Sequence, residues 1–207
     1  MSLVESSQEN SQESSQMEST AVRFTIPEFI RMAEMGVFDD RERVRIELIE
    51  GEVREMMSPT NPPHGNTHQR LIAWAFRKIP ADIGTVFSQY SLQLTATESV
   101  LEPDLYVAVP TDYAQRWPNE SEALLVVEVS DSTLMHDLGE KASLYSRSGI
   151  SDYWVVDVAR ECIHVHRDPN TEGQGGYRSI HVFKKAESVS PLAFPEISLQ
   201  VKTLFAE

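Results

Sequence analysis

Apolar residues along this chain alternate between helical and strand-like spacing, and the pattern begins near Phe24. Thr25 and Glu28 have the spacing of a capping box, which predicts a short helix that stops near Gly36. The next segment has two apolar-rich runs on either side of Glu50-Gly51 and predicts a β-hairpin. The ordered chain is therefore expected to open with a helix followed by a hairpin.

A second helix is predicted over residues 67–79, just before Pro80. Its apolar positions at helical spacing are Leu71, Ile72, Ala75 and Phe76. Two short strands are expected after this helix, over residues 85–88 and 90–95.

The centre of the chain carries two apolar runs of strand length, at residues 105–109 and 123–129. Both runs are apolar on both faces, which is typical of strands that are covered on each side. A helix over residues 137–148 and a strand over residues 152–158 are predicted next, which indicates a right-handed βαβ crossover. A further strand is predicted over residues 162–167.

The last part of the chain is expected to lie at the edge of this arrangement. A loop is predicted from Arg167 to Gly176, and the final apolar segments, residues 177–183 and 197–205, are expected to pack peripherally. Together the elements predict an α/β fold (mixed α+β) in which a central mixed sheet is flanked by helices.

Length and composition fit one folded unit. The chain has 207 residues, of which 41% are hydrophobic and 24% charged, close to globular averages. Residues 1–20 are mostly Ser, Gln and Glu, so we expect a disordered tail followed by a single domain over residues 21–207. No apolar run approaches the roughly 20 residues that span a bilayer. The polar start lacks the pattern of a signal peptide, and the single cysteine, Cys162, cannot form an internal disulfide, so a cytoplasmic protein is expected.

The net charge of the chain is −14, which counts against non-specific binding of nucleic acid. Such binding comes largely from Lys and Arg side chains that neutralise phosphates. Residues 1–20 contain four Glu and no Lys or Arg, so they carry −4 and leave −10 on the rest of the chain. If nucleic acid is the ligand, it is expected to be met through a local basic patch and metal ions.

Two carboxylates lie at the boundaries of the central apolar runs. Asp104 comes directly before the first run, and Glu128 lies near the end of the second. An ionised carboxylate among such neighbours is costly unless it is paired or binds a metal. On neighbouring strands the two would suit Mg²⁺, which can activate a water molecule and neutralise a phosphodiester. The alternative is that Asp104 caps a turn and Glu128 pairs with a basic side chain, and spacing alone does not separate the two.

Two further residues are candidates for the same chemistry. Glu47 lies in the predicted hairpin, where its alternation by itself favours a surface charge. Lys141 lies on the predicted helix after Glu128, with Tyr145 one turn later on the same stripe. A lysine directed at the carboxylates could position the attacking water or stabilise a pentacoordinate phosphate. By itself the helix pattern favours an ordinary ion pair between Lys141 and Asp137.

The histidines and glycines give weaker patterns. His64 and His68 have the i, i+4 spacing of zinc ligands, but the chain has no HExxH motif and no cysteine pair, so a zinc site is not expected there. His164 and His166 share one face of a predicted strand, without an evident third ligand. The glycines between positions 173 and 176 follow no strand and open no helix, so they predict a loop and not a phosphate cradle.

Six short motifs follow one another in the order IELIEGE, MSPTNPPH, EPDLYV, LLVVEVSDST, D-x-x-x-K-x-x-x-Y-x-x-x-G and DYWVVD. In this order they resemble the Uma-two family, which is grouped with restriction endonucleases in the PD-(D/E)XK nuclease superfamily. The resemblance covers about Phe24 to Arg167. It implies a restriction-endonuclease-like fold and hydrolysis of DNA, with Mg²⁺ as the cofactor and Mn²⁺ as its substitute.

The resemblance also implies roles for particular residues. Asp104, in the Pro-Asp element, and Glu128, at the second acidic position, correspond to metal ligands. Glu47 falls on the family's early glutamate, which implies help with the metal or the water. Tyr145 and His64 match further family positions to which no role is assigned.

One departure from the usual motif affects the expected activity. The lysine that normally follows two residues after the second acid is replaced here by Ser130. Lys141 matches a helical lysine that takes over its place in this branch of the superfamily. The sequence therefore leaves two hypotheses: a Mg²⁺-dependent endodeoxyribonuclease, or a catalytically degenerate nuclease fold that binds a partner protein or nucleic acid. A homodimer with no membrane partner is expected, because cutting both strands of a duplex usually needs two sites.

Overall fold

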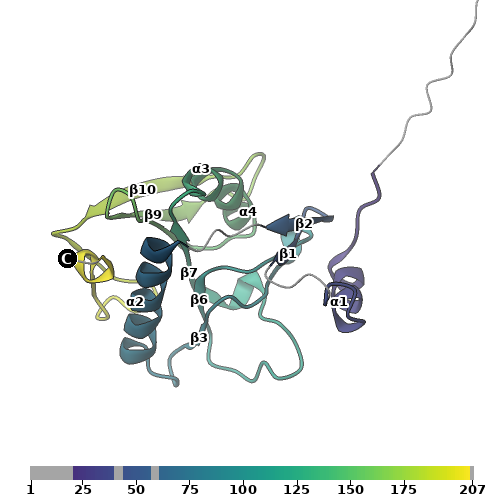
Figure 1. The fold of residues 1–207 in the computed structure, drawn as a ribbon, viewed down its shortest axis with the longest axis horizontal. Coiled ribbons are helices and arrows are strands. Elements are labelled where there is room, and N and C mark those ends of the chain that lie inside the picture. The colour runs from purple at the N-terminus through teal and green to yellow at the C-terminus, as the bar shows by residue number, and fades with distance from the viewer. Residues whose placement is uncertain (1–20, 40–43, 57–60, 206–207) are drawn as a thin grey trace, which may run out of the picture.

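A computed structural model describes residues 21–39, 44–56 and 61–205 of the chain (Figure 1). The expected tail, residues 1–20, lies outside the described residues, as does the start of the MSPTNPPH motif. The helices are α1 (Ile26–Glu34), α2 (Pro62–Lys78), α3 (Leu134–His136) and α4 (Ala142–Arg147), with 3-10 turns at Thr95–Thr97, Glu120–Glu122 and Val201–Leu204 and a π turn at Asp137–Lys141. The strands are β1 (Arg45–Ile49), β2 (Glu52–Met56), β3 (Thr85–Phe87), β4 (Leu92–Leu94), β5 (Ser99–Leu101), β6 (Leu105–Ala108), β7 (Ala123–Ser130), β8 (Asp152–Asp157), β9 (Cys162–Pro169), β10 (Tyr177–Lys184), β11 (Ser188–Val189) and β12 (Leu199–Gln200).

The described residues form three sheets. The six-stranded one, called the larger sheet, is mixed and has the strand order β10-β9-β8-β7-β6-β3. Strands β7 and β8 are parallel, and the other neighbouring pairs are antiparallel. The helical segment from α3 to α4 connects the parallel pair, so the predicted strand–helix–strand unit is confirmed. A second sheet, with the order β2-β1-β5-β4, is antiparallel throughout, and β11 and β12 form a third. The predicted α/β class is therefore confirmed.

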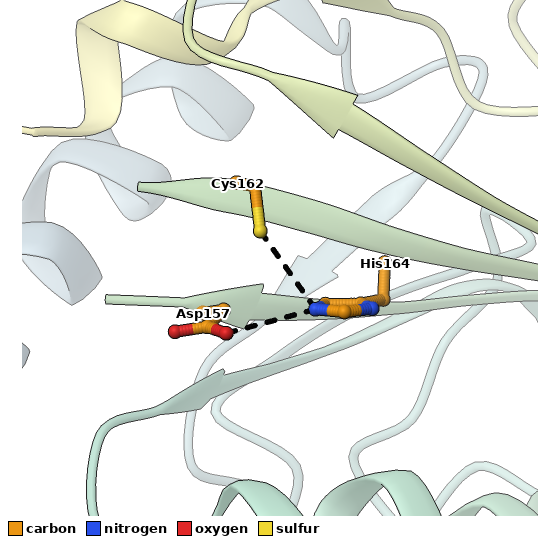
Figure 2. Close-up of side chains that lie close together, drawn as sticks. All are labelled: Asp157, Cys162 and His164. Carbon is orange, nitrogen blue, oxygen red and sulfur yellow. Dashed lines mark hydrogen bonds and ion pairs between the residues drawn. The ribbon is translucent and has the colours of Figure 1, made fainter. Parts of the chain in front are cut away.

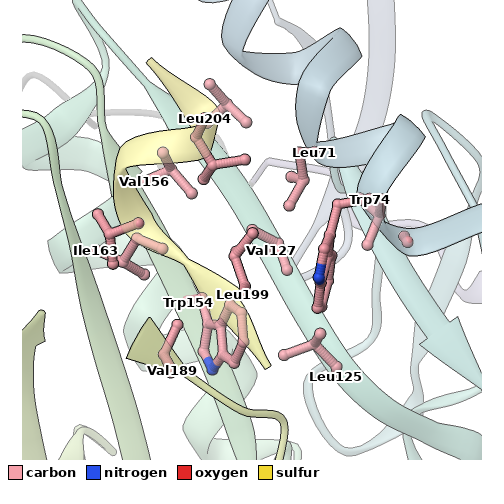
Figure 3. Close-up of a cluster of buried hydrophobic side chains, with 14 of the residues drawn as sticks. Leu71, Trp74, Leu125, Val127, Trp154, Val156, Ile163, Val189, Leu199 and Leu204 are labelled. Atoms are coloured by element: carbon pink, nitrogen blue, oxygen red, sulfur yellow. The ribbon is translucent and has the colours of Figure 1, made fainter. Parts of the chain in front are cut away.

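Both faces of the larger sheet are covered, because successive side chains of its strands point to opposite faces. On one face, Val127 and Trp154 pack beneath α2 and the C-terminal segment (Figure 3). On the other face, Val126 and Tyr153 pack against Tyr145 of α4 and against the second sheet. This double burial explains why the central strands are apolar at nearly every position.

The second helix starts earlier than the sequence pattern predicted. Asn61 caps α2 by accepting a hydrogen bond from the backbone N–H of His64 at 3.0 Å, and Pro62 occupies the first turn, where no N–H is needed. Trp74 is buried, whereas Phe76 is 62% exposed, so the prediction of Phe76 on the apolar stripe is wrong. The predicted stripe positions Leu71 and Ala75 are buried, so the prediction is confirmed there.

The C-terminal segment is more central than predicted. Leu199, Val201, Leu204 and Phe205 are each 4% exposed or less and pack into the core beneath α2 (Figure 3). The expectation that residues 197–205 pack peripherally is therefore wrong. The 3-10 turn brings positions three apart onto one side, which gives the segment a continuous apolar face. The other final segment forms β10, an edge strand whose residues are mostly exposed.

The predicted capping box of α1 is confirmed and provides a test of local stability. The Thr25 side chain accepts from the Glu28 backbone N–H, and the Glu28 carboxylate accepts from the Thr25 N–H at 2.8 Å. We expect Thr25→Ala to lower the free energy of unfolding by about 1 kcal/mol, because orphan N–H groups lose their acceptor. Urea denaturation measures the change, and Thr111→Ala, another exposed threonine, is the control. A loss of equal size in both variants would contradict a role for the cap.

Within residues 21–39, 44–56 and 61–205, no helix has both the length and the apolar content needed to cross a membrane.

Candidate active site

An acidic cleft lies between the end of β7, the strand β1, the start of α2 and the π turn. The charged residues that line it include Arg45, Glu47, Asp104, Glu128, Asp137 and Lys141. All four candidates from the sequence, Glu47, Asp104, Glu128 and Lys141, are thus brought to one place.

The register of two neighbouring strands positions Asp104 and Glu128. Leu105 of β6 pairs with Val127 of β7 in an antiparallel ladder, so the next position places Asp104 opposite Glu128 on the same face. Both side chains line the cleft and are 4% and 2% exposed, respectively. Adjacent strands therefore direct the two carboxylates into one cleft.

The Asp104 carboxylate is held in its ionised form by several donors. Arg45 Nη2 lies 2.9 Å from Oδ1, and the backbone N–H of Val129 donates to Oδ2 at 2.8 Å. His64 Nε2 lies 3.8 Å from Oδ2, and the carboxylate raises the pKa of this imidazole. Burial alone would raise the pKa of Asp104, but His64, Arg45 and the Val129 N–H together hold that pKa well below its ordinary value.

His68 contacts the backbone of Asp104. Its Nε2 lies 2.9 Å from the backbone oxygen of Asp104 and 3.2 Å from the hydroxyl of Ser88. The two histidines of α2 therefore contact Asp104 at different atoms, His64 at the carboxylate and His68 at the backbone.

Glu128 is paired with the helical lysine. Lys141 Nζ lies 2.8 Å from Glu128 Oε1, and the hydroxyl of Tyr145 donates to the same oxygen at 2.9 Å. Lys141 Nζ is also 4.0 Å from Oε1 of Glu47 and 4.0 Å from Oδ1 of Asp137. The ion pair with Asp137 that the helix pattern favoured is thus the longer contact, and Glu128 is the nearer partner.

A π turn places this lysine. The helix was predicted to begin at Asp137, but α3 starts at Leu134, and one π-helical turn from Asp137 to Lys141 lies between α3 and α4. A π turn adds a residue to the helical repeat, which changes the direction of the side chains that follow, and such turns occur often at functional sites. Lys141 is only 5% exposed as a result of its place over the sheet.

Glu47 lies inside the molecule. Its side chain is 1% exposed, and Oε1 accepts a hydrogen bond from the Glu102 backbone N–H at 2.9 Å. Among the described residues, none donates a hydrogen bond to Glu47 Oε2, although this atom is buried. The interpretation of Glu47 as a surface charge of the hairpin is therefore wrong, because the second sheet packs this face of β1 against the cleft.

The cleft carries more negative than positive charge. Glu47, Asp104, Glu128 and Asp137 are each 4% exposed or less, and Arg45 and Lys141 lie beside them as cations. Burial, opposed by Lys141 and reinforced by Asp104 and Asp137, raises the pKa of Glu128 to about 7. Burial would lower the pKa of Lys141, but the surrounding carboxylates raise it, so the ammonium stays charged.

Arg45 and Asp137 are among the cleft residues that the sequence did not identify as part of the site. Arg45 precedes Glu47 by two positions and therefore shares its face of β1, and Asp137 precedes Lys141 by four positions on the helix. Asp137 accepts hydrogen bonds through Oδ2 from Ser130 and from Thr133, the latter at 2.7 Å. Either spacing could have indicated these residues once Glu47 and Lys141 were placed in the site.

The other histidine pair lies further along the sheet. His164 lies near Asp157 and Cys162, whereas His166 is 3% exposed and packs against the rings of Tyr153 and Tyr177. Asp157 and Cys162 are therefore the neighbours of His164 that were not evident in the sequence.

The chain is similar to one family of proteins and to a solved structure. No curated protein sequence matches the chain. The crystal structure of a "putative nuclease belonging to DUF820" from Anabaena variabilis superposes with a TM-score of 0.64 at 17% sequence identity, over 88% of this chain and 97% of that one. This likeness shows a restriction-endonuclease-like fold. Residues 26–202 match the Uma2 family model, described as "Putative restriction endonuclease", and the chain therefore belongs to the Uma2 family.

Proposed function

We propose that this protein is a metal-dependent endonuclease that hydrolyses phosphodiester bonds in DNA at the acidic cleft. The observation that carries the proposal is the convergence of Asp104, Glu128 and Lys141 on one cleft, with Lys141 Nζ 2.8 Å from Glu128. Membership of the Uma2 family supports nuclease chemistry.

The residues of the cleft fit a hard divalent cation. Carboxylate oxygens are the ligands that Mg²⁺ and Mn²⁺ take in proteins. Among the described residues, Glu47 Oε2 receives no hydrogen bond while buried in the lining, which leaves an oxygen free for a cation. The excess of carboxylates over Arg45 and Lys141 also means that a cation would relieve repulsion. Asp104 and Glu128 would hold the ion, and Glu47 would hold it or a water molecule beside it.

Different residues of the chain would have different roles in hydrolysis. A divalent cation bound there supplies charge neutralisation and lowers the pKa of a water molecule. Arg45 and the Val129 N–H fix the Asp104 carboxylate, so this ligand is oriented before substrate arrives. We assign to the Lys141 ammonium the stabilisation of the negative charge that grows on the phosphate oxygens as a water oxygen bonds to phosphorus and the P–O bond to the leaving alkoxide breaks. Tyr145 holds Glu128 through its hydroxyl.

A local basic groove supports DNA as the substrate despite the net charge of −14. Arg70, Arg77 and Lys78 line a groove between α2 and the C-terminal segment. Helix α2 also carries His64 at its other end, in the acidic cleft, so one helix connects the two places. Cationic side chains along a helix face give the phosphate contacts that position a duplex without reading its sequence. We also propose that two chains act together to cut both strands.

A plasmid-nicking assay with Mg²⁺ or Mn²⁺ tests the function. We expect the wild type to convert supercoiled DNA to nicked and linear forms, and Asp104→Ala to show no conversion. Calorimetry with Mn²⁺ is expected to show at least about tenfold weaker binding in Asp104→Asn and in Glu128→Gln, because each removes a charged oxygen ligand while keeping the shape.

Asp112→Asn is the matched control, because Asp112 is an exposed carboxylate outside the cleft. Unchanged Mn²⁺ affinity in both cleft variants would remove Asp104 and Glu128 from the site. Metal binding without cleavage of any DNA would instead leave a binding module built on a nuclease fold.

A further inference from the structure

A second group of metal-ligating side chains lies on the larger sheet, away from the acidic cleft. Asp157 ends β8, and Cys162 and His164 lie at the start of β9 (Figure 2). Asp157 pairs with Cys162 in the antiparallel ladder, and His164 is two residues further along β9, so all three side chains share one face. Figure 2 shows them directed toward one another.

Two of the three distances between the donor atoms are close to those of a tetrahedral zinc site. Cys162 Sγ is 3.7 Å from His164 Nε2, and that nitrogen is 3.7 Å from Asp157 Oδ2. One donor atom from each of the three residues lies within 4.8 Å of the others. Zinc with ordinary bond lengths sets its sulfur and nitrogen ligands about 3.6 Å apart and its nitrogen and oxygen ligands about 3.3 Å apart. Both distances from His164 Nε2 are therefore within a few tenths of an ångström of those in a zinc site.

The chemistry of the three donors differs from that of the acidic cleft. A thiolate, an imidazole and a carboxylate together select a borderline-soft cation such as Zn²⁺, whereas the carboxylates of the acidic cleft suit a hard one. Asp157 is 1% exposed and Cys162 is 6% exposed, while the His164 side chain is 18% exposed and leaves a path from solvent. Burial and the neighbouring Asp157 carboxylate raise the pKa of the Cys162 thiol, so a bound cation displaces its proton to solvent.

Arg160 accounts for part of this cluster but not all of it. Its Nη1 lies 2.9 Å from Asp157 Oδ2, and its backbone N–H donates to Oδ1 at 2.9 Å. This pairing explains a buried aspartate at a turn, but it does not explain why His164 lies beside the same oxygen and Cys162 beside His164. The Arg160 side chain is 68% exposed, so it can move into solvent at little cost, while the backbone N–H keeps the carboxylate oriented.

We propose that Asp157, Cys162 and His164 form a second cation site, which binds Zn²⁺ through three protein ligands and one water molecule. The site joins the end of β8 to the start of β9, one strand beyond β7, which carries Glu128. It does not depend on the proposed nuclease function, because none of its residues lines the acidic cleft.

Calorimetric titration of the full chain with Zn²⁺, in the presence of excess Mg²⁺, tests the proposal. We expect one Zn²⁺ ion to bind per chain, and the affinity to fall by about 100-fold in Cys162→Ser and in His164→Ala. Co²⁺ is expected to give a thiolate charge-transfer absorption band that Cys162→Ser lacks. The matched control is His181→Ala, which removes an exposed histidine of β10 and should leave the affinity unchanged.

The variant Arg160→Ala tests the site even if a variant of one of the three ligands folds poorly. This change removes the guanidinium that competes for Asp157 Oδ2, so we expect Zn²⁺ to bind more tightly than in the wild type, a gain that misfolding cannot produce. The proposal is overturned if the wild type shows no Zn²⁺ affinity up to about millimolar concentrations. It is equally overturned if Cys162→Ser, His164→Ala and Arg160→Ala all bind Zn²⁺ as the wild type does.

Discussion

Lys141→Ala is expected to lower the rate of DNA cleavage by about 10²–10³ while largely preserving metal binding. The ammonium lies 2.8 Å from Glu128 and carries a positive charge that no other buried lysine in the described part of the chain provides. A lysine is not a ligand for cations, so its removal takes away stabilisation of the transition state and leaves the carboxylates in place. Single-turnover nicking rates at saturating Mn²⁺, beside calorimetry with Mn²⁺, measure the two effects separately.

Lys202→Ala is the control, since Lys202 is exposed and lies outside the cleft. The double variant Lys141→Ala with Ser130→Lys should recover part of the lost rate. Ser130 is two residues after Glu128 on β7 and shares its face, and its hydroxyl donates to Asp137 in the cleft wall. A lysine there would fill the space that the Lys141 side chain vacates. Cleavage at the wild-type rate by Lys141→Ala would show that the helical lysine has no part in catalysis.

Local patterns predicted those parts of the fold that depend on neighbours in sequence. The capping box of α1 and the turn at Glu50-Gly51 were predicted from a few adjacent residues, and both residues of that turn have positive φ, at 50° and 81°. The doubly apolar runs predicted buried central strands because coverage on two faces leaves no polar alternation. Asp104 and Glu128 could be paired because the ends of such strands meet.

The parts that the sequence did not predict depend on packing between distant segments. Glu47 alternates like a surface residue of a hairpin, and only the pairing of β1 with β5 and the approach of Glu102 bury it. The C-terminal segment is short and irregular, so its burial beneath α2 follows from tertiary contacts rather than from periodicity. Neither of these two contacts follows from a local sequence pattern.

The largest expected effect on stability concerns Glu128 and pH. Burial raises the pKa of this carboxyl group from its ordinary value of 4.5 to about 7. Between these values the folded protein keeps a proton that the unfolded chain has released, so stability falls as the pH rises and the loss is complete above about pH 7. With metal removed by a chelator, the ionised carboxylate costs the folded state on the order of 3 kcal/mol at pH 8. Glu128→Gln cannot lose a proton and is free of this cost.

Urea unfolding of the wild type and of Glu128→Gln at pH 5 and pH 8 measures the effect as a difference of differences. We expect the variant to gain on the order of 3 kcal/mol relative to the wild type between the two pH values. The pKa of His64 is also raised, and its loss of stability with rising pH has the same sign, but it occurs in both proteins and cancels. Mn²⁺ added at pH 8 should stabilise the wild type, because the cation compensates the charge that the buried carboxylate carries. A difference that stays constant from pH 5 to pH 8 would mean that Lys141 keeps Glu128 ionised throughout, and the cleft would then hold its negative charge without strain.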